Sequence, residues 1–166
     1  ISQLIGQGER GEKLNRAIGT YFFSQLAVGL VMTVIGVALT DWIISILKVP
    51  EEAVPDARSY LKITTAGLVF SYGYNMISGV LRGMGNSNHP FLFIAVASVI
   101  NIVLDIVFIK YCGLGVFGAG LATILGQAIA FIYAAIFLYN RRDEFGFDFK
   151  LKSFIPSMDI FNSLMK

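Results

Sequence analysis

The stretch YCGLGVFGAGLATILGQAIAFIYAAIFLYN, Tyr111–Asn140, runs for 30 residues without a charged side chain. An α-helix crosses the hydrocarbon core of a bilayer with about 20 apolar residues, so this stretch is long enough to span a membrane. Two more segments carry no charge, Ala17–Thr40 (24 residues) and Ile63–Leu81 (19 residues), and Pro90–Ile109 is interrupted only by Asp105. The pattern predicts an all-α, polytopic transmembrane helical bundle. A buried helix of a large soluble protein is the weaker alternative, because such helices are rarely this long and uniformly apolar.

The composition agrees with a membrane protein and excludes several kinds of site. Of the 166 residues, 55% are hydrophobic and 14% are charged, whereas a soluble domain has about a quarter charged residues. The net charge of +2 is too small to indicate a nucleic-acid partner. One cysteine, Cys112, excludes an internal disulfide and a cysteine metal cluster, and one histidine, His89, excludes a multi-histidine metal site. No set of nucleophile, base and orienting group can be assembled, so we expect no enzyme.

Four complete spanning helices are expected, at about 17–47, 55–81, 90–110 and 115–139. Residues 1–16 are predicted to be the end of a preceding helix and a cytoplasmic loop, residues 17–139 the transmembrane part, and residues 140–166 a cytoplasmic amphipathic linker. The chain has no initiator Met and opens on ISQLIGQG. We therefore expect it to be part of a longer protein.

The basic residues of the loops predict the orientation in the membrane. One side carries eight of them: Arg10, Lys13, Arg16, Arg82, Arg141, Arg142, Lys150 and Lys152. The other side carries four, diluted by acidic residues: Lys48, Arg58, Lys62 and Lys110. Loops rich in Lys and Arg stay in the cytoplasm. The first side is therefore predicted to be cytoplasmic, in a multi-pass protein of the prokaryotic plasma membrane.

Asp105 is the charged residue that interrupts the apolar run Pro90–Ile109. An ionisable side chain at the centre of a span costs roughly 2.5 to 3.5 kcal/mol on insertion scales and usually faces the bundle interior. Asn101 lies four residues earlier and Ser98 one turn before that, so all three project from one helical face. In an antiparallel hairpin centred near Cys112, Thr123 is expected level with Asn101. By the same register, the small Ala119 is expected level with Asp105, and Gln127 one turn deeper than Thr123.

A carboxylate, an amide and a hydroxyl are thus predicted to meet at one depth. The carboxylate of Asp105 could take up a proton, because burial disfavours its charged form. It could instead bind Na⁺ together with Asn101, since amide and hydroxyl oxygens are hard ligands suited to a hard cation. A purely structural hydrogen bond of Asp105 is the alternative. Thr123 could equally bond only its own backbone, as membrane threonines often do.

Weaker candidates lie on the predicted span 55–81. Asn75 and Ser78 are three residues apart and could face the same interior. Tyr60, near the outer end of this span, is most simply an aromatic residue of the membrane interface.

Four stretches together resemble the multidrug and toxic compound extrusion (MATE) family. They are IGQGERGEKLNRAIGT (Ile5–Thr20), YNMISGVLRGMGNSNHP (Tyr74–Pro90), NIVLD (Asn101–Asp105) and GLGVFGAGLATILGQ (Gly113–Gln127). They follow one another in the family's order over nearly the whole chain.

The resemblance implies a fold of twelve spanning helices in two six-helix lobes. This chain would cover the end of helix 2 through helix 6, which is part of the N-terminal lobe, and the C-terminal lobe would be its partner. The family's N-lobe cation site would match Asn101, Asp105, Thr123 and Tyr60. Ser78 stands where some members carry Asn, which leaves a ligand there open, and the acidic residue of helix 1 has no counterpart in this chain.

The resemblance also implies a function. MATE proteins are secondary active antiporters that export cationic or amphipathic drugs and toxic compounds in exchange for H⁺ or Na⁺, with no other cofactor. Asp105 would be the coupling carboxylate. A flippase for lipid-linked sugars is an alternative, although it should carry cationic residues in its cavity, and the spans here carry essentially none. A non-transporting scaffold or remnant is the other alternative. Substrate, coupling ion and oligomeric state stay open.

Overall fold

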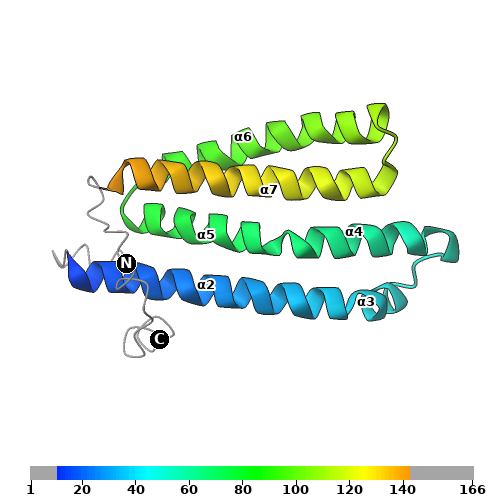
Figure 1. Cartoon of the computed structure of the whole chain (residues 1–166), viewed down its shortest axis with the longest axis horizontal. Coiled ribbons are helices and arrows are strands. Elements are labelled where there is room, and N and C mark those ends of the chain that lie inside the picture. Colours follow the sequence, from blue (N-terminus) through cyan, green and yellow to red (C-terminus); the bar gives the residue numbers. More distant parts are fainter. Residues whose placement is uncertain (1–10, 143–166) are drawn as a thin grey trace.

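In the computed structural model, which describes residues 11–142, the chain is a bundle of helices joined by short turns (Figure 1). The elements follow the chain as α2 (Glu12–Ala38), α3 (Thr40–Ile46), the 3₁₀ turn η1 (Glu51–Ala53), α4 (Val54–Ala66), α5 (Leu68–Gly83), α6 (Asn88–Asp105), the π-helix η2 (Ile106–Tyr111) and α7 (Gly115–Asn140). The predicted linker 140–166 and the predicted loop 1–16 lie largely outside the described residues.

Three uninterrupted helices of the described part are long and apolar enough to cross a membrane. They are α2, α6 continued by η2 over Asn88–Tyr111, and α7. The predicted span 55–81 is instead two helices, α4 and α5, which follow end to end and are separated at Gly67 (Figure 1). With this pair, the chain passes along the bundle four times, as predicted.

The break at Gly67 has a packing reason. A Cβ atom at this position would lie 2.6 Å from Ile124 Cγ1 and 3.2 Å from Gln127 Oε1, both on α7. Glycine lets α7 approach closely, while its weak helix propensity makes it an easy place to interrupt a helix.

The first helix of the structure begins and ends at other residues than predicted. Its observed start is Glu12, five residues before the expected Ala17, because the charged first turn continues the helix and Glu12 pairs with Arg16 at 2.8 Å. The predicted single helix to residue 47 ends at Ala38, and α3 continues after Leu39.

The helices form a row in the order α6, α7, α4 with α5, and α2 (Figure 1). The central helix α7 packs on α6, α4 and α5, and α2 packs on α5 and α4. Five buried positions of α7 repeat every four residues and are small, which permits close helix contact in lipid, where packing replaces the hydrophobic effect. They are Gly118, Ala122, Gly126, Ala130 and Ala134, and Gly120 and Leu138 are buried as well.

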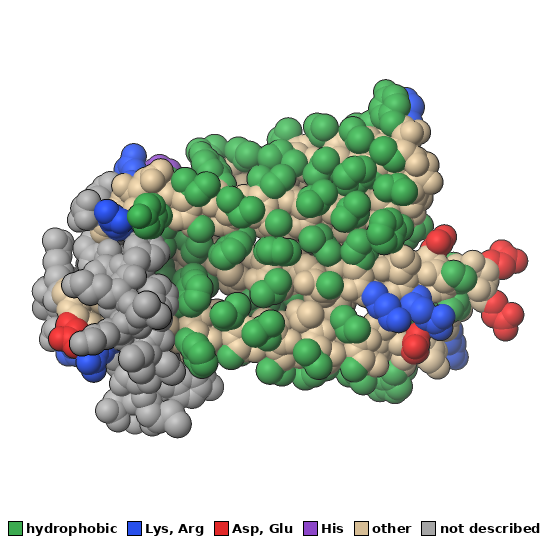
Figure 2. Space-filling view, in the orientation of Figure 1, with side chains coloured by type: hydrophobic (Ala, Val, Ile, Leu, Met, Phe, Trp, Pro, Cys, Tyr) green, Lys and Arg blue, Asp and Glu red, His purple; other side chains and the backbone are tan. Residues whose placement is uncertain are grey.

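A cluster of buried apolar residues forms a core at the end of the bundle where α5 ends and α6 begins. It consists of Leu14, Ile18, Met76, Ile77, Val80, Leu81, Phe93, Ala134 and Leu138. Apolar side chains also cover the outside, with Val34, Phe91 and Val99 all more than 60% exposed, and charged side chains gather at the two ends (Figure 2). Such a surface suits a bilayer, and the predicted assignment of the ends to cytoplasm and exterior stays a prediction.

Candidate functional site

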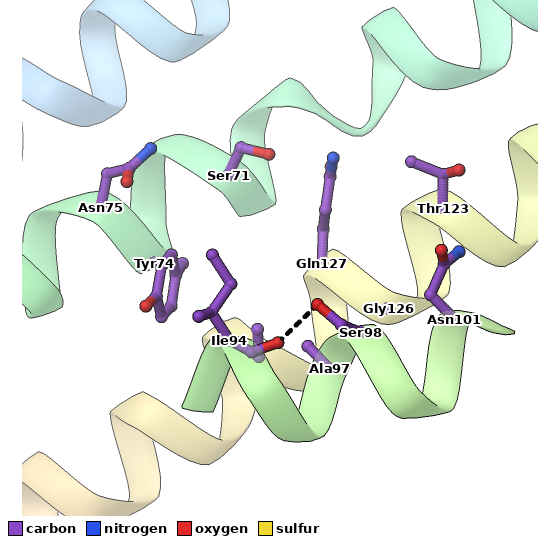
Figure 3. A pocket seen from close by; sticks show the side chains of 11 residues that line it. Ser71, Tyr74, Asn75, Ile94, Ala97, Ser98, Asn101, Thr123, Gly126 and Gln127 are labelled. Carbon is purple, nitrogen blue, oxygen red and sulfur yellow. Dashed lines mark hydrogen bonds between the residues drawn. The ribbon is translucent and has the colours of Figure 1, made fainter. Parts of the chain in front are cut away.

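A cavity of about 270 Å³ opens between α5, α6 and α7 (Figure 3). Its walls are formed by Ser71, Tyr74, Asn75, Ile94, Ala97, Ser98, Asn101, Thr123, Gly126, Gln127 and Ala130. These side chains come from three helices that are far apart in sequence, and Figure 3 shows polar groups of all three around the space. None of the eleven described lining residues is charged.

Four of the predicted site residues line this cavity: Asn75, Asn101, Thr123 and Gln127. A glycine of α7 also lies close to Asn101. A Cβ atom at Gly126 would lie 3.2 Å from Asn101 Cβ and 3.4 Å from the Ala97 carbonyl oxygen. Position 126 thus lies between Ala97 and Asn101 along α6, close to residue 98, which a hairpin centred near Cys112 places opposite it. Nearer the turn, Gly118 faces Phe108, whose Cβ is 3.0 Å from the equivalent position.

The other predicted residues do not line the cavity. Tyr60 is 38% exposed on α4 and packs against α7 at Gly120, where its Cδ2 would lie 3.5 Å from a Cβ atom. Ser78 is fully buried on α5, one turn beyond Asn75. Ala119 accepts a backbone hydrogen bond from Thr123 and adds no polar side chain.

Asp105 is the last residue of α6, one helical turn beyond Asn101, and is only partly exposed. Its Oδ1 is buried and has no hydrogen-bond partner among the described residues. The helix changes to π geometry directly after it, at Ile106, and the Cys112 N–H donates to the Val107 carbonyl at 2.9 Å. Short π-helical segments are rare in proteins, and those that occur are often found at functional sites. The π-helix after Asp105 therefore indicates a specialised position, independently of the side-chain evidence.

Two buried polar atoms of the cavity wall also lack a described partner, Asn101 Nδ2 and Gln127 Oε1. Leaving a buried donor or acceptor unsatisfied costs about 1 to 3 kcal/mol, and native structures contain few such atoms. Asp105 Oδ1 on α6 and Ser78 Oγ on α5 are the other two buried side-chain atoms without a described partner. These groups are available to a ligand, a cation or water.

The hydroxyls around the cavity are held by backbone carbonyls. Thr123 Oγ1 donates to Ala119 O at 2.9 Å, and Ser98 Oγ donates to Ile94 O at 2.8 Å. Each hydroxyl thus uses its proton within its own helix and keeps oxygen lone pairs that can accept or coordinate. Tyr74 Oη donates to Pro90 O at 2.7 Å and ties α5 to the start of α6 beside the cavity.

Sequence reasoning missed two polar lining residues, Ser71 and Tyr74. Ser71 lies four residues before Asn75, so the same helical spacing that linked Asn101 to Asp105 would have found it. Tyr74 had no such signal, because its role depends on a contact with a different helix.

Comparisons with known proteins agree with this architecture. A family model described as MatE matches residues 1–107. The chain is 42% identical over 107 residues (64% of the chain, 24% of the relative) to the probable multidrug resistance protein YpnP of Bacillus subtilis, and 29% identical over 161 residues (93% and 35%) to YoeA of the same organism, also a probable multidrug resistance protein.

Solved structures give the same assignment. The fold superposes with a TM-score of 0.90 on the inward-facing conformation of a multidrug resistance MATE family transporter of the MOP superfamily, at 29% identity, over 99% of this chain and 37% of that one. The chain thus spans about a quarter to a third of the length of the curated relatives named above. On the family match and this fold, it belongs to the multidrug and toxic compound extrusion family.

Proposed function

We propose that this chain acts as part of the N-terminal lobe of a secondary active antiporter that exports cationic or amphipathic compounds in exchange for H⁺ or Na⁺. The family consists of transporters rather than enzymes. The observation that carries the coupling proposal is the buried Oδ1 of Asp105, which has no described partner and lies one helical turn beyond Asn101 of the cavity wall. An intramembrane carboxylate of this kind marks an ion or proton pathway.

The carboxylate can act as a two-state switch. A proton would neutralise Asp105 and turn an unsatisfied acceptor into a possible donor. Na⁺ would instead use hard oxygen ligands, which Asp105, Asn101 and Thr123 supply from α6 and α7. The described residues hold no group of three or more His, Cys, Asp or Glu side chains, so a transition-metal site is not proposed. Either cation would shift the balance between inward- and outward-facing states in proportion to its preference for one of them.

The uncharged cavity favours amphipathic cargo over a phosphate-bearing one. Its walls combine apolar side chains with a few amides and hydroxyls, which is the usual make-up of a small-molecule pocket. A flippase for lipid-linked sugars would need cationic groups to hold phosphate, and no described lining residue supplies one. We therefore place export of drug-like compounds ahead of that alternative.

The remaining partners follow from the family. The C-terminal lobe would close the substrate path, and the bilayer would cover the apolar outside. Relatives from Bacillus subtilis and Staphylococcus haemolyticus are named as multidrug resistance and export proteins, so we propose the bacterial cytoplasmic membrane as the location.

The test is efflux of a fluorescent cationic dye from cells that express the full-length transporter or its Asp105→Asn variant at matched protein levels. Runs with an imposed proton gradient and with a sodium gradient identify the coupling ion. Asp56→Asn is the matched control, because it makes the same chemical change on an exposed carboxylate in the first turn of α4.

Gradient-driven efflux should be lost in Asp105→Asn and kept in Asp56→Asn. If Asp105→Asn pumps as well as the parent, Asp105 is structural and the coupling proposal is wrong. If the parent itself exports no dye under either gradient, the result favours the alternative that the protein is a non-transporting scaffold or remnant.

A further inference from the structure

A second hollow lies on the opposite face of α5 from the polar cavity, where α5 packs between α2 and α7 (Figure 1). It has a volume of about 100 Å³, and it shares no lining residue with the polar cavity. Its wall includes Phe22, Gln25 and Leu26 of α2, Phe70 and Met76 of α5, and Phe131 of α7. The wall is therefore mainly aromatic and apolar, with one amide and no charged residue among the described ones.

The amide of Gln25 lies at the middle of a membrane-spanning helix. Because α2 runs from Glu12 to Ala38, Gln25 is about 20 Å along the axis from each end. An amide at that depth needs a hydrogen-bond partner, since hydrocarbon offers none. Within the part of the chain that the structure describes, the Gln25 side chain makes no hydrogen bond. Its donor and its acceptor are thus available to a molecule in the hollow.

The aromatic part of the wall is held in place by the core. Met76 is 3% exposed and belongs to the buried core, and Phe131 packs against that core. Gly73 lets the Phe131 ring lie directly on α5, since a Cβ atom there would lie 2.6 Å from Phe131 Cε2. The Phe70 ring completes this wall, with its centroid 6.4 Å from that of Phe131 and an angle of 45° between the rings. These contacts give the hollow a fixed aromatic wall.

The size and the wall together select one kind of occupant. A dry apolar cavity of about 150 Å³ holds a benzene ring. This hollow is smaller but opens at Leu26, which is 38% exposed, so one ring fits with an edge at the rim. Aromatic side chains attract a further ring at an angle, and the thioether of Met76 also favours contact with a ring.

Two other occupants fit less well. A water molecule needs about two to four polar partners, and Gln25 is the polar side chain of the described wall. A lipid acyl chain could fill the space but offers no hydrogen bond to the amide. A molecule that satisfies both parts of the wall combines an aromatic ring with a hydrogen-bonding group.

We propose that this hollow binds a small neutral aromatic compound with one hydrogen-bonding group, of the phenol or benzyl alcohol type. The ring would lie against Phe70, Phe131 and Met76, and its hydroxyl would hydrogen-bond to the amide of Gln25. The compound is neutral because no described lining residue supplies a counter-charge at a depth where a charge is costly. An occupant of this hollow and one of the polar cavity would lie on opposite faces of α5.

The test is a titration of the purified full-length transporter in detergent, with ¹³C in its methionine methyl groups, read by NMR. An aromatic ring bound beside Met76 shifts the signal of its methyl group, which is identified from a Met76→Leu sample. Met32 is the internal control, because it is 43% exposed and lies outside the hollow. Phenol is compared with toluene, which has a methyl group in place of the hydroxyl, and with cyclohexanol, which keeps the hydroxyl but is not aromatic.

Two variants change the hollow, and a third is the matched control. Gln25→Leu removes the amide at similar size, and Val69→Phe fills the hollow from α5. Val28→Phe adds the same bulk on α2, at a position that is 47% exposed and outside the hollow. Phenol should shift the Met76 signal to saturation in the parent and in Val28→Phe, and this saturable shift should be lost in Val69→Phe.

The amide and the ring should contribute separately. Gln25→Leu should weaken phenol binding about fivefold, since one neutral hydrogen bond contributes about 1 kcal/mol, and it should not weaken toluene binding. Cyclohexanol, measured by competition with phenol, should bind about fivefold more weakly than phenol because it lacks the ring contacts.

The proposal is overturned if phenol leaves the Met76 signal of the parent in place, which would show that another part of the transporter fills the hollow. It is also overturned if the Met76 and Met32 signals move together without saturation, because that is partition into the micelle, or if Val69→Phe and Val28→Phe have equal effects. Phenol binding by Gln25→Leu as tight as by the parent would rule out the amide, and this comparison decides alone if Val69→Phe does not fold. No ion gradient or dye is used, so the result is independent of the coupling proposal.

Discussion

Gly67→Ala tests the contact that places α7 against the broken helix beside the cavity. The new Cβ would lie 2.6 Å from Ile124 Cγ1, which is 0.8 Å shorter than the 3.4 Å at which ordinary contact begins. Isoleucine is stiff at χ1, so Cγ1 cannot turn away cheaply. Overpacking of this size costs about 1 to 3 kcal/mol, and replacing glycine in a helical conformation returns about 0.5 to 1 kcal/mol. The net expectation is a loss of about 1 kcal/mol, within a range of about 0 to 2.5 kcal/mol.

A denaturant titration of the transporter in detergent micelles measures this loss as a change in the free energy of unfolding. Ile124→Ala removes the colliding atom, so the double variant should recover about 1 kcal/mol or more relative to the sum of the single changes. Gly79→Ala is the matched control on α5, because its Cβ would meet only the end of a flexible side chain, Tyr21 Oη at 3.1 Å.

The reasoning is refuted if Gly67→Ala is as stable as Gly79→Ala. It is also refuted if Ile124→Ala gives no recovery, because the loss would then arise from the backbone at the break and not from helix packing. A loss of efflux without a loss of stability would instead point to displacement of Gln127, whose Oε1 would lie 3.2 Å from the new atom.

Three further changes separate stability from function. Gln127→Leu should leave the free energy of unfolding unchanged or raise it by about 1 kcal/mol, because it removes the buried unpartnered Oε1, while dye efflux should fall; a clear loss of stability would contradict this. Tyr74→Phe should cost about 0.5 to 1.5 kcal/mol in the same titration, since it deletes the 2.7 Å bond to the Pro90 carbonyl, and no change would show that this bond is not formed. Arg58→Gln should cost less than about 1 kcal/mol, because its 2.7 Å ion pair with Asp41 is exposed, and thermal unfolding at low and high salt checks this expectation.

Local spacing was enough to predict part of the site. Asn101 and Asp105 share a face because they lie one turn apart on a single helix, and the structure leaves a buried polar atom of each without a described partner. The hairpin argument brought Thr123 and Gln127 to the same cavity as Asn101. The π-helical turn after Asp105 has no simple sequence signal.

Two further predictions, Ser78 and Tyr60, depended on which face of a helix meets its neighbours, and they stay predictions. Ser78 and Asn75 are close in sequence, yet Asn75 lines the cavity and Ser78 is buried in the packed part of α5. Tyr60 packs at the α4–α7 contact and not on the cavity.

The sequence by itself determined that this is a membrane protein and how many times the chain crosses the bilayer. The reason is that a helix must be long and uncharged to span the hydrocarbon core, where a charged side chain is energetically costly. The sequence also determined that Asp105 and Asn101 lie on one helical face, since that relation is set by 3.6 residues per turn. Only the tertiary structure decided that residues of α5, α6 and α7 line one uncharged cavity and that the helix breaks at Gly67. The physical reason is that lipid is as apolar as the helix surfaces, so the contacts between helices follow from close packing of small residues such as Gly126 and not from the hydrophobic pattern.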